Sequence, residues 1–153
     1  MSRAITPSQP VVEKEWEAPI YTDAYGKLPA QNVARARAFY ADKLGLKPYK
    51  EHADHLYFEV GHTTFLIFPS TGAPSGTHDQ LGFIVEDVES TVARLQSKGV
   101  TFEIFPGPPG ATMKNGIMDR GTMKAAWLKD TEGNLISFAE FRQGSPFRHE
   151  PSE

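Results

Sequence analysis

The sequence of 153 residues lacks cysteine altogether. Disulfides, thiolate metal ligands and a cysteine nucleophile are therefore excluded, and the cytoplasm is the expected compartment. The sequence also lacks an apolar run of about 18 residues, which a membrane-spanning helix would need. Residues 1–16 contain no continuous apolar stretch of the kind that signal peptides carry. We therefore expect neither a membrane-spanning segment nor a secretory leader.

A strong charge of either sign is missing as well. Lys and Arg number 16 and Asp and Glu number 19, which gives a net charge of −3 with neutral histidines. Nucleic-acid-binding domains usually carry a basic face, so we do not expect a nucleic-acid partner. With 39% hydrophobic and 23% charged residues, the composition is that of a globular chain. The length favours one domain or two small modules that share a core.

Two segments have the residue pattern of amphipathic helices. The first begins at Asn32, a favoured N-cap, and ends before Gly45, which suits the left-handed conformation after a helix. The second repeats this pattern between Asp87 and Gly99. The distance from cap to glycine is 13 residues in the first segment and 12 in the second. This likeness indicates an internal duplication.

Extended segments surround both helices in the same order. One strand precedes each helix, at residues 21–28 and 80–85, and an extended segment and a hairpin follow it. The hairpin strands are expected at 55–60 and 63–68, and again at 124–129 and 135–141. Two copies of strand, helix and three strands can close a curved sheet around a shared interior, so we predict an α+β fold. The expected divisions are a flexible N-terminal arm at 1–18, modules at 19–75 and 76–143, and a polar C-terminal tail at 144–153.

The second copy has a longer middle segment, residues 105–123, which is rich in proline and glycine. Loops of this length in a compact domain are often functional. Phe105 and three methionines in the segment could close over a ligand, because methionine adapts to irregular apolar surfaces. They could equally pack on the barrel itself or on a second subunit.

Four stretches carry a family likeness: LPAQNVARARAFYADKLGL at 28–46, LGFIVEDVESTVARLQSKGV at 81–100, KDTEGN at 129–134 and LISFAEF at 135–141. Together they resemble the vicinal-oxygen-chelate superfamily, which includes glyoxalase I, extradiol dioxygenases, fosfomycin-resistance transferases and bleomycin-resistance proteins. The resemblance implies paired βαβββ modules that form an open, eight-stranded mixed barrel around a cavity. It also implies a homodimer, since dimers are frequent in this superfamily.

Enzymes of this superfamily usually hold a divalent metal with four side chains, one from each of four strands. The resemblance places Tyr25 at the first of these positions, Gln80 at the third and Ser137 at the fourth. The second position falls within residues 65–68 (FLIF), which contain no metal-ligating side chain. Divalent ions are held by carboxylate oxygen or imidazole nitrogen. We therefore expect no metal at the usual site and no cofactor, as in the metal-free bleomycin-resistance proteins.

The same positions suit a small organic ligand. Trp127 could form an aromatic wall for a planar molecule, or it could be a core residue that touches no ligand. Tyr25 and Gln80 could hydrogen-bond a neutral polar ligand, each other or water. The residues that we expect to line the cavity are Tyr25, Tyr57, Gln80, Phe105, Trp127 and Ser137.

The leading hypothesis is a metal-free binding protein that sequesters a toxic or planar small organic molecule, with no catalytic residue assigned. One alternative is a glyoxalase-like lyase or isomerase that uses a displaced metal at His78, or at His52 and His55. A second alternative is a non-catalytic interaction module whose cavity is filled by its own side chains.

Overall fold

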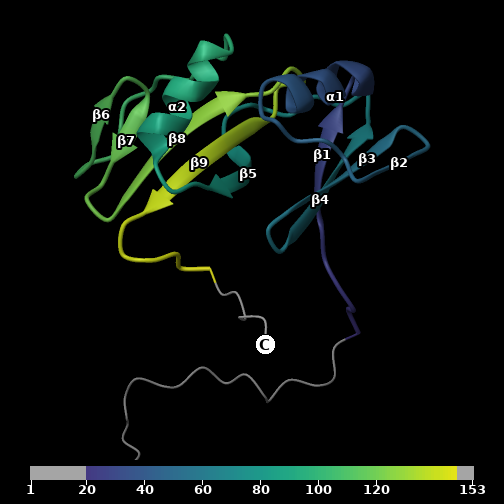
Figure 1. Cartoon of the computed structure of the whole chain (residues 1–153), viewed down its shortest axis with the longest axis horizontal. Coiled ribbons are helices and arrows are strands. Elements are labelled where there is room, and N and C mark those ends of the chain that lie inside the picture. The colour runs from purple at the N-terminus through teal and green to yellow at the C-terminus, as the bar shows by residue number, and fades with distance from the viewer. Residues whose placement is uncertain (1–19, 148–153) are drawn as a thin grey trace, which may run out of the picture.

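The computed structural model describes residues 20–147, so the arm expected at 1–18 and the end of the tail lie outside the described residues (Figure 1). Both predicted helices are present. Helix α1 (Val33–Asp42) begins after Asn32, whose side chain accepts a hydrogen bond from the Arg35 amide at 2.9 Å. Helix α2 (Val88–Ser97) begins after Asp87, which accepts one from the Ser90 amide at 3.1 Å. The N-caps inferred from sequence are therefore confirmed.

The first module contains a four-stranded sheet, which we call sheet 1. Its strands are β1 (Gly26–Ala30), β2 (Lys50–His52), β3 (His55–Val60) and β4 (Thr63–Pro69). They lie in the order β1-β4-β3-β2, with β1 parallel to β4 and the other pairs antiparallel. The hairpin was predicted almost to the residue, whereas the first strand begins five residues later than residue 21.

The second module contains sheet 2, with five strands. They are β5 (Asp79–Ile84), β6 (Thr112–Lys114), β7 (Ile117–Asp119), β8 (Met123–Lys129) and β9 (Leu135–Phe141). Their order is β5-β9-β8-β7-β6, with β5 parallel to β9. The described chain thus has nine strands rather than the expected eight.

The additional hairpin lies inside the segment expected to be one long loop. Strands β6 and β7 are joined by Asn115 and Gly116, which both have positive φ (55° and 79°). Asn-Gly is a strong signal for a two-residue hairpin turn, because both residues tolerate this conformation. The surrounding prolines and glycines obscured that signal. Met118 on β7 is buried, so this part of the segment packs on its own sheet.

The two modules share one hydrophobic core. Helix α1 packs on β3 and β4, and α2 packs on β8 and β9. Between the modules the Phe65 and Phe83 rings lie 6.2 Å apart, and Phe83 stacks on Phe138 at 5.6 Å. Figure 1 shows the first module on the right and the second on the left, with both helices at the top. Each sheet therefore has one face in the common core and one face without a helix.

The α+β class and the open arrangement of the paired modules are confirmed, since the strands form two separate sheets. Both helices in residues 20–147 are too short and too polar to cross a membrane.

Candidate functional site

We call the helix-free faces of sheets 1 and 2 the first and second open faces. Strand alternation decides which side chains they carry. In sheet 1, Tyr57 lies opposite Leu66, and Lys27 lies opposite Leu66 on its other side. Their neighbours Leu28 and Phe58 belong to the core. The first open face therefore carries tyrosine, leucine and lysine in one row.

A pocket of about 410 Å³ lies on the first open face. Its lining comes from the first module alone and consists of Asp23, Ala24, Tyr25, Tyr49, Tyr57, Thr64 and Leu66. Leu66 is almost fully buried, whereas the Tyr25 and Tyr49 side chains are 59% and 60% exposed. The pocket thus has an apolar floor and an accessible aromatic rim.

Aromatic contacts hold this rim together. The Tyr49 and Tyr57 rings lie 6.4 Å apart, and the Tyr49 amide donates to the Tyr57 carbonyl at 2.8 Å. The Lys50 Nζ lies 5.5 Å from the Tyr57 ring centroid, and His55 stacks against the same ring. Such contacts hold an aromatic ring in place before any ligand arrives.

The second open face carries a row of small residues that ends in tryptophan. Ser137 lies opposite Gly82 on one side and opposite Trp127 on the other. A Cβ atom at Gly82 would lie only 2.9 Å from the Ser137 Oγ, so glycine leaves the space that this hydroxyl occupies. The Phe105 ring packs on Trp127 with centroids 5.1 Å apart. This pair forms an aromatic corner beside the small residues.

The structure divides the predicted lining between the two sheets. Tyr25 and Tyr57 share the pocket on sheet 1. By register, Ser137 and Trp127 lie on the second open face, with Phe105 against the tryptophan, while Gln80 lies in β5 where the register with β9 shifts. That all six residues line one cavity stays a prediction. The sequence argument missed Tyr49, which belongs to the pocket; its pairing with Tyr57 depends on the register between the short strand β2 and β3.

The positions that resemblance assigns to metal ligands carry neutral side chains. Tyr25 is exposed, while Gln80 and Ser137 lie on sheet 2. His52 and His55 lie opposite each other across a two-residue turn, where the His55 Nδ1 is 2.9 Å from the Ala53 carbonyl. Within residues 20–147, no three His, Asp or Glu side chains gather closely enough to hold a metal ion.

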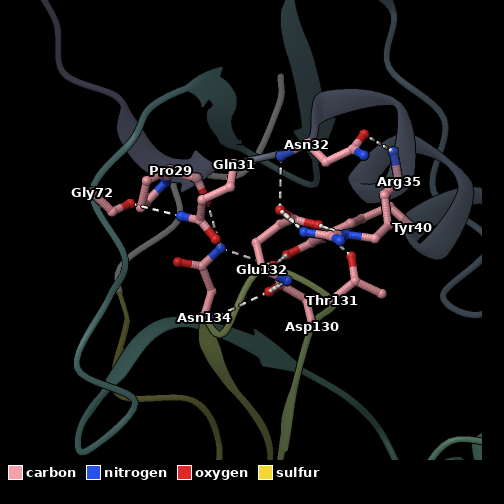
Figure 2. A network of polar contacts seen from close by, with 10 residues as sticks. All are labelled: Pro29, Gln31, Asn32, Arg35, Tyr40, Gly72, Asp130, Thr131, Glu132 and Asn134. Atoms are coloured by element: carbon pink, nitrogen blue, oxygen red, sulfur yellow. Dashed lines mark hydrogen bonds and ion pairs between the residues drawn. The ribbon is translucent and has the colours of Figure 1, made fainter.

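Two buried acidic residues, Asp130 and Glu132, lie in the turn between β8 and β9 (Figure 2). Asp130 is buried, and its carboxylate accepts four hydrogen bonds of 2.8–2.9 Å. The donors are the Tyr40 hydroxyl, the Glu132 and Asn134 amides, and the Asn134 side chain. The Asn134 Nδ2 also donates to the Pro29 carbonyl of the first module at 3.0 Å. The turn therefore joins the end of sheet 2 to β1 and α1.

Glu132 makes the second connection between the modules. Its carboxylate accepts hydrogen bonds from the Asn32 amide at 3.0 Å, from the Arg35 guanidinium at 2.8 and 3.0 Å, and from the Thr131 hydroxyl at 2.7 Å. Burial alone would raise the pKa of Glu132, but the hydrogen bonds and the Arg35 charge outweigh it and lower the pKa to about 2. The carboxylate is therefore ionised at neutral pH.

The pKa of Tyr40 is shifted in the opposite direction. Burial, together with the neighbouring Asp130 charge, raises the pKa of its hydroxyl well above the ordinary value. The hydroxyl stays protonated and donates to Asp130 at 2.8 Å. The two carboxylates and the Tyr40 hydroxyl are hydrogen-bonded within the protein, which indicates a structural role for this network, whereas the buried Asn134 Oδ1 has no hydrogen-bond partner.

A family model for the Glyoxalase/Bleomycin resistance protein/Dioxygenase superfamily matches residues 23–138. No curated protein sequence matches the chain. Among solved structures, the fosfomycin resistance protein FosX from Listeria monocytogenes superposes with a TM-score of 0.61 at 13% identity. The match covers 84% of this chain and 97% of that protein.

Two further structures are similar. The antibiotic binding protein TnmS3 from Streptomyces sp. CB03234 has a TM-score of 0.60 at 19% identity, covering 82% of this chain and 99% of that one. A lactoylglutathione lyase from Agrobacterium tumefaciens has a TM-score of 0.58 at 18% identity, covering 82% and 98%. At such identities the likeness shows a common fold. On the family match, which extends from the approach to β1 into β9, the chain belongs to the Glyoxalase/Bleomycin resistance protein/Dioxygenase superfamily.

Proposed function

We propose that this protein binds a small planar organic molecule, without a metal ion, at its open sheet faces. One observation carries the proposal: exposed aromatic side chains cluster on these faces, while the superfamily's ligand positions hold Tyr25, Gln80 and Ser137. An aromatic ring offers a flat apolar surface, and the hydroxyl and amide groups offer hydrogen bonds of either polarity. Such a site suits capture of a ligand more than its activation.

The arrangement of the modules favours a homodimer as the binding unit. Within one chain the two sheets share their helix-side core, and the pocket on sheet 1 draws no residue from sheet 2. A second copy could bring its Trp127 and Phe105 over the Tyr25 and Tyr57 of the first. Sequestration of a toxic compound then needs only affinity and an excess of protein. We place the protein in the cytoplasm because it has no cysteine.

Trp127 fluorescence tests the binding site directly. The chain has two tryptophans, so a Trp16→Phe background leaves Trp127 as the only reporter. We expect saturable quenching by at least one member of a panel of bleomycin, fosfomycin and fused-ring aromatics. Ligand affinity, measured by calorimetry, should fall about tenfold in Trp127→Ala, since an aromatic anchor typically contributes more than 1 kcal/mol. Trp127→Phe keeps a ring and should lose much less.

Elemental analysis of protein purified without chelators provides the second test. We expect no stoichiometric divalent metal and no change in ligand affinity with EDTA. One bound ion per chain, with an activity lost on chelation, would replace the proposal by the lyase or isomerase alternative. A flat response across the panel, with Trp127→Ala indistinguishable from the parent, would favour a filled cavity and an interaction module.

A further inference from the structure

A second, larger pocket lies between the modules and away from the open-face pocket. It has a volume of about 510 Å³ and is lined by the end of α1 with the residues after it, by β3, by one side of α2, and by β5 and β9. Pockets that hold small molecules commonly have volumes of 300–1,000 Å³. It shares no lining residue with the pocket that contains Tyr25 and Tyr57. We call it the helix groove.

The apolar part of the helix groove comes from both modules. Its apolar side chains are Leu44, Leu46, Val60, Phe83, Ile84, Val85, Leu95 and Phe138. Most of them also pack against the common core, so they form a firm wall. Ile84 is 48% exposed, which leaves apolar surface accessible to a ligand. This wall suits an alkyl chain or another apolar body.

The charged part of the helix groove is entirely basic. Lys43, Arg94 and Lys98 line it, and no acidic residue between positions 20 and 147 does. The Lys43 Nζ donates to the Lys98 carbonyl at 2.6 Å, which keeps this cation at the groove. Among residues 20–147, no ion pair involves the side chain of Arg94 or Lys98. Lys43 takes part in no ion pair within these residues either, so none of the three cations is neutralised by a carboxylate.

Helix ends alone do not account for this charge. Cations are expected near the last turn of a helix, because its C-terminus carries about half a negative charge. Helices α1 and α2 both end at the groove, which corresponds to about one negative charge in total. Three basic side chains exceed it by about two charges, so an anion is favoured there.

We propose that the helix groove binds a free, single-chain anionic amphiphile of the fatty-acid type. Its carboxylate lies among Lys43, Arg94 and Lys98, and its alkyl chain lies along Leu46, Val60 and Phe83. The site is independent of the proposed open-face function. The three basic side chains favour a negatively charged head group, and the apolar wall favours an apolar tail.

Calorimetric titration of the full chain with decanoate, below its micelle concentration, tests the proposal. We expect saturable binding of one decanoate per chain. Hexanoate should bind at least tenfold more weakly, because each buried methylene contributes severalfold to affinity. Decyltrimethylammonium has a tail only one carbon longer but a positive head group, and it should not bind. Amide chemical-shift changes should be confined to the groove lining, at residues 43–46, 60, 83–85, 90–98 and 138, whichever ligand occupies the open faces.

Variants distinguish the effect of the basic residues in the helix groove from the effect of the protein's net charge. Arg94→Gln with Lys98→Gln should raise the Kd for decanoate about tenfold, since each solvent-facing charge contributes modestly. The matched control is Lys114→Gln with Arg120→Gln, which removes the same charge from exposed residues outside the groove and should leave the Kd unchanged. All four side chains are exposed, so folding is not at stake.

Three results would overturn the proposal. They are equal binding of decyltrimethylammonium, an unchanged Kd in the Arg94/Lys98 variant, and a lack of saturable decanoate binding. Sedimentation with anionic vesicles but no response to monomeric decanoate would also overturn it, because the basic groove would then contact a membrane surface rather than a free amphiphile.

Discussion

The two helices have similar N-cap residues, but different parts of the protein supply the carboxylates that accept hydrogen bonds from the amides at their N-termini. At α2, the Val88 amide donates to Glu140 of β9, which belongs to the same module, at 3.0 Å. At α1, the Asn32 amide donates to Glu132, which comes from the other module 100 residues away. In a capping box the residue three positions after the N-cap supplies this acceptor. In α1 that residue is Arg35, and it pairs with the same Glu132.

This difference shows which contacts join the two repeated modules into one folded unit. Each module repeats strand, helix and hairpin, and the β8–β9 turn of the second module reaches across to the helix of the first. The matching β3–β4 turn is the shorter Gly61-His62, which borders a small pocket of about 200 Å³. The acidic side chains of the longer turn stabilise the junction, whereas the positions that the resemblance assigns to metal ligands carry the neutral side chains of Tyr25, Gln80 and Ser137.

Removing the centre of the junction should have the largest effect. Asp130→Ala removes the acceptor of four hydrogen-bond donors in a buried site. They are the Tyr40 hydroxyl, the Glu132 and Asn134 backbone amides, and the Asn134 side-chain amide. We expect a loss of about 3–5 kcal/mol in the free energy of unfolding, since each unsatisfied buried donor costs about 1–3 kcal/mol. Urea denaturation followed by circular dichroism measures it. A loss below about 1 kcal/mol would mean that water replaces the carboxylate easily.

Glu132→Gln should break the cross-module cap. The glutamine side chain keeps the shape of glutamate but lacks the negative charge that strengthens the hydrogen bonds from Arg35 and Asn32. We expect a loss of about 2–3 kcal/mol, limited because the Arg35 side chain is half exposed. The same denaturation experiment measures it at pH 7. An equal loss in a background that already carries Arg35→Met would show that the ion pair contributes little.

Acid should weaken the same junction. The pKa of Glu132 is lowered from 4.5 to about 2 in the folded state, so the unfolded state takes up the proton first as the pH falls. Its stabilising contribution is complete above about pH 5 and is lost as the pH falls towards 2. By pH 3 the loss due to this one group is about 2 kcal/mol. Unfolding free energies at several pH values measure it, and the slope should flatten in Glu132→Gln. A variant with the parent's full slope would assign the acid sensitivity to other carboxylates.

Glu140→Gln is the matched change at the other helix and should have the smallest effect. It alters one acceptor of the Val88 amide within a single module. We expect a loss of about 0.5–1 kcal/mol, typical of a helix cap. If this loss equalled that of Glu132→Gln, the contrast between the two helix starts would have no energetic meaning.

The sequence predicts the repeated elements well because their signals are local. The helices begin after Asn32 and Asp87 and end before Gly45 and Gly99, and period-two alternation indicates the strands of the long hairpins. The candidate site was harder to predict. Family positions pointed to Tyr25, which lines the pocket, whereas Tyr49 directly precedes β2, a three-residue strand that carries almost no pattern of its own. The role of Glu132 was also missed, because nothing near it in the chain shows that it caps a helix 100 residues earlier.

The sequence by itself determined the duplicated pattern of elements, the helix boundaries and the neutral side chains at the positions that the resemblance assigns to metal ligands. Spacing and residue type suffice for these features, because they depend on neighbours a few positions away. Only the tertiary structure decided which faces of the two sheets share the core and which stay open. It also decided that Asp130 and Glu132 join the modules, and that Lys43 meets α2 at the helix groove. These features depend on how two independently patterned modules pack, and the free energy of that packing is distributed over contacts far apart in the chain.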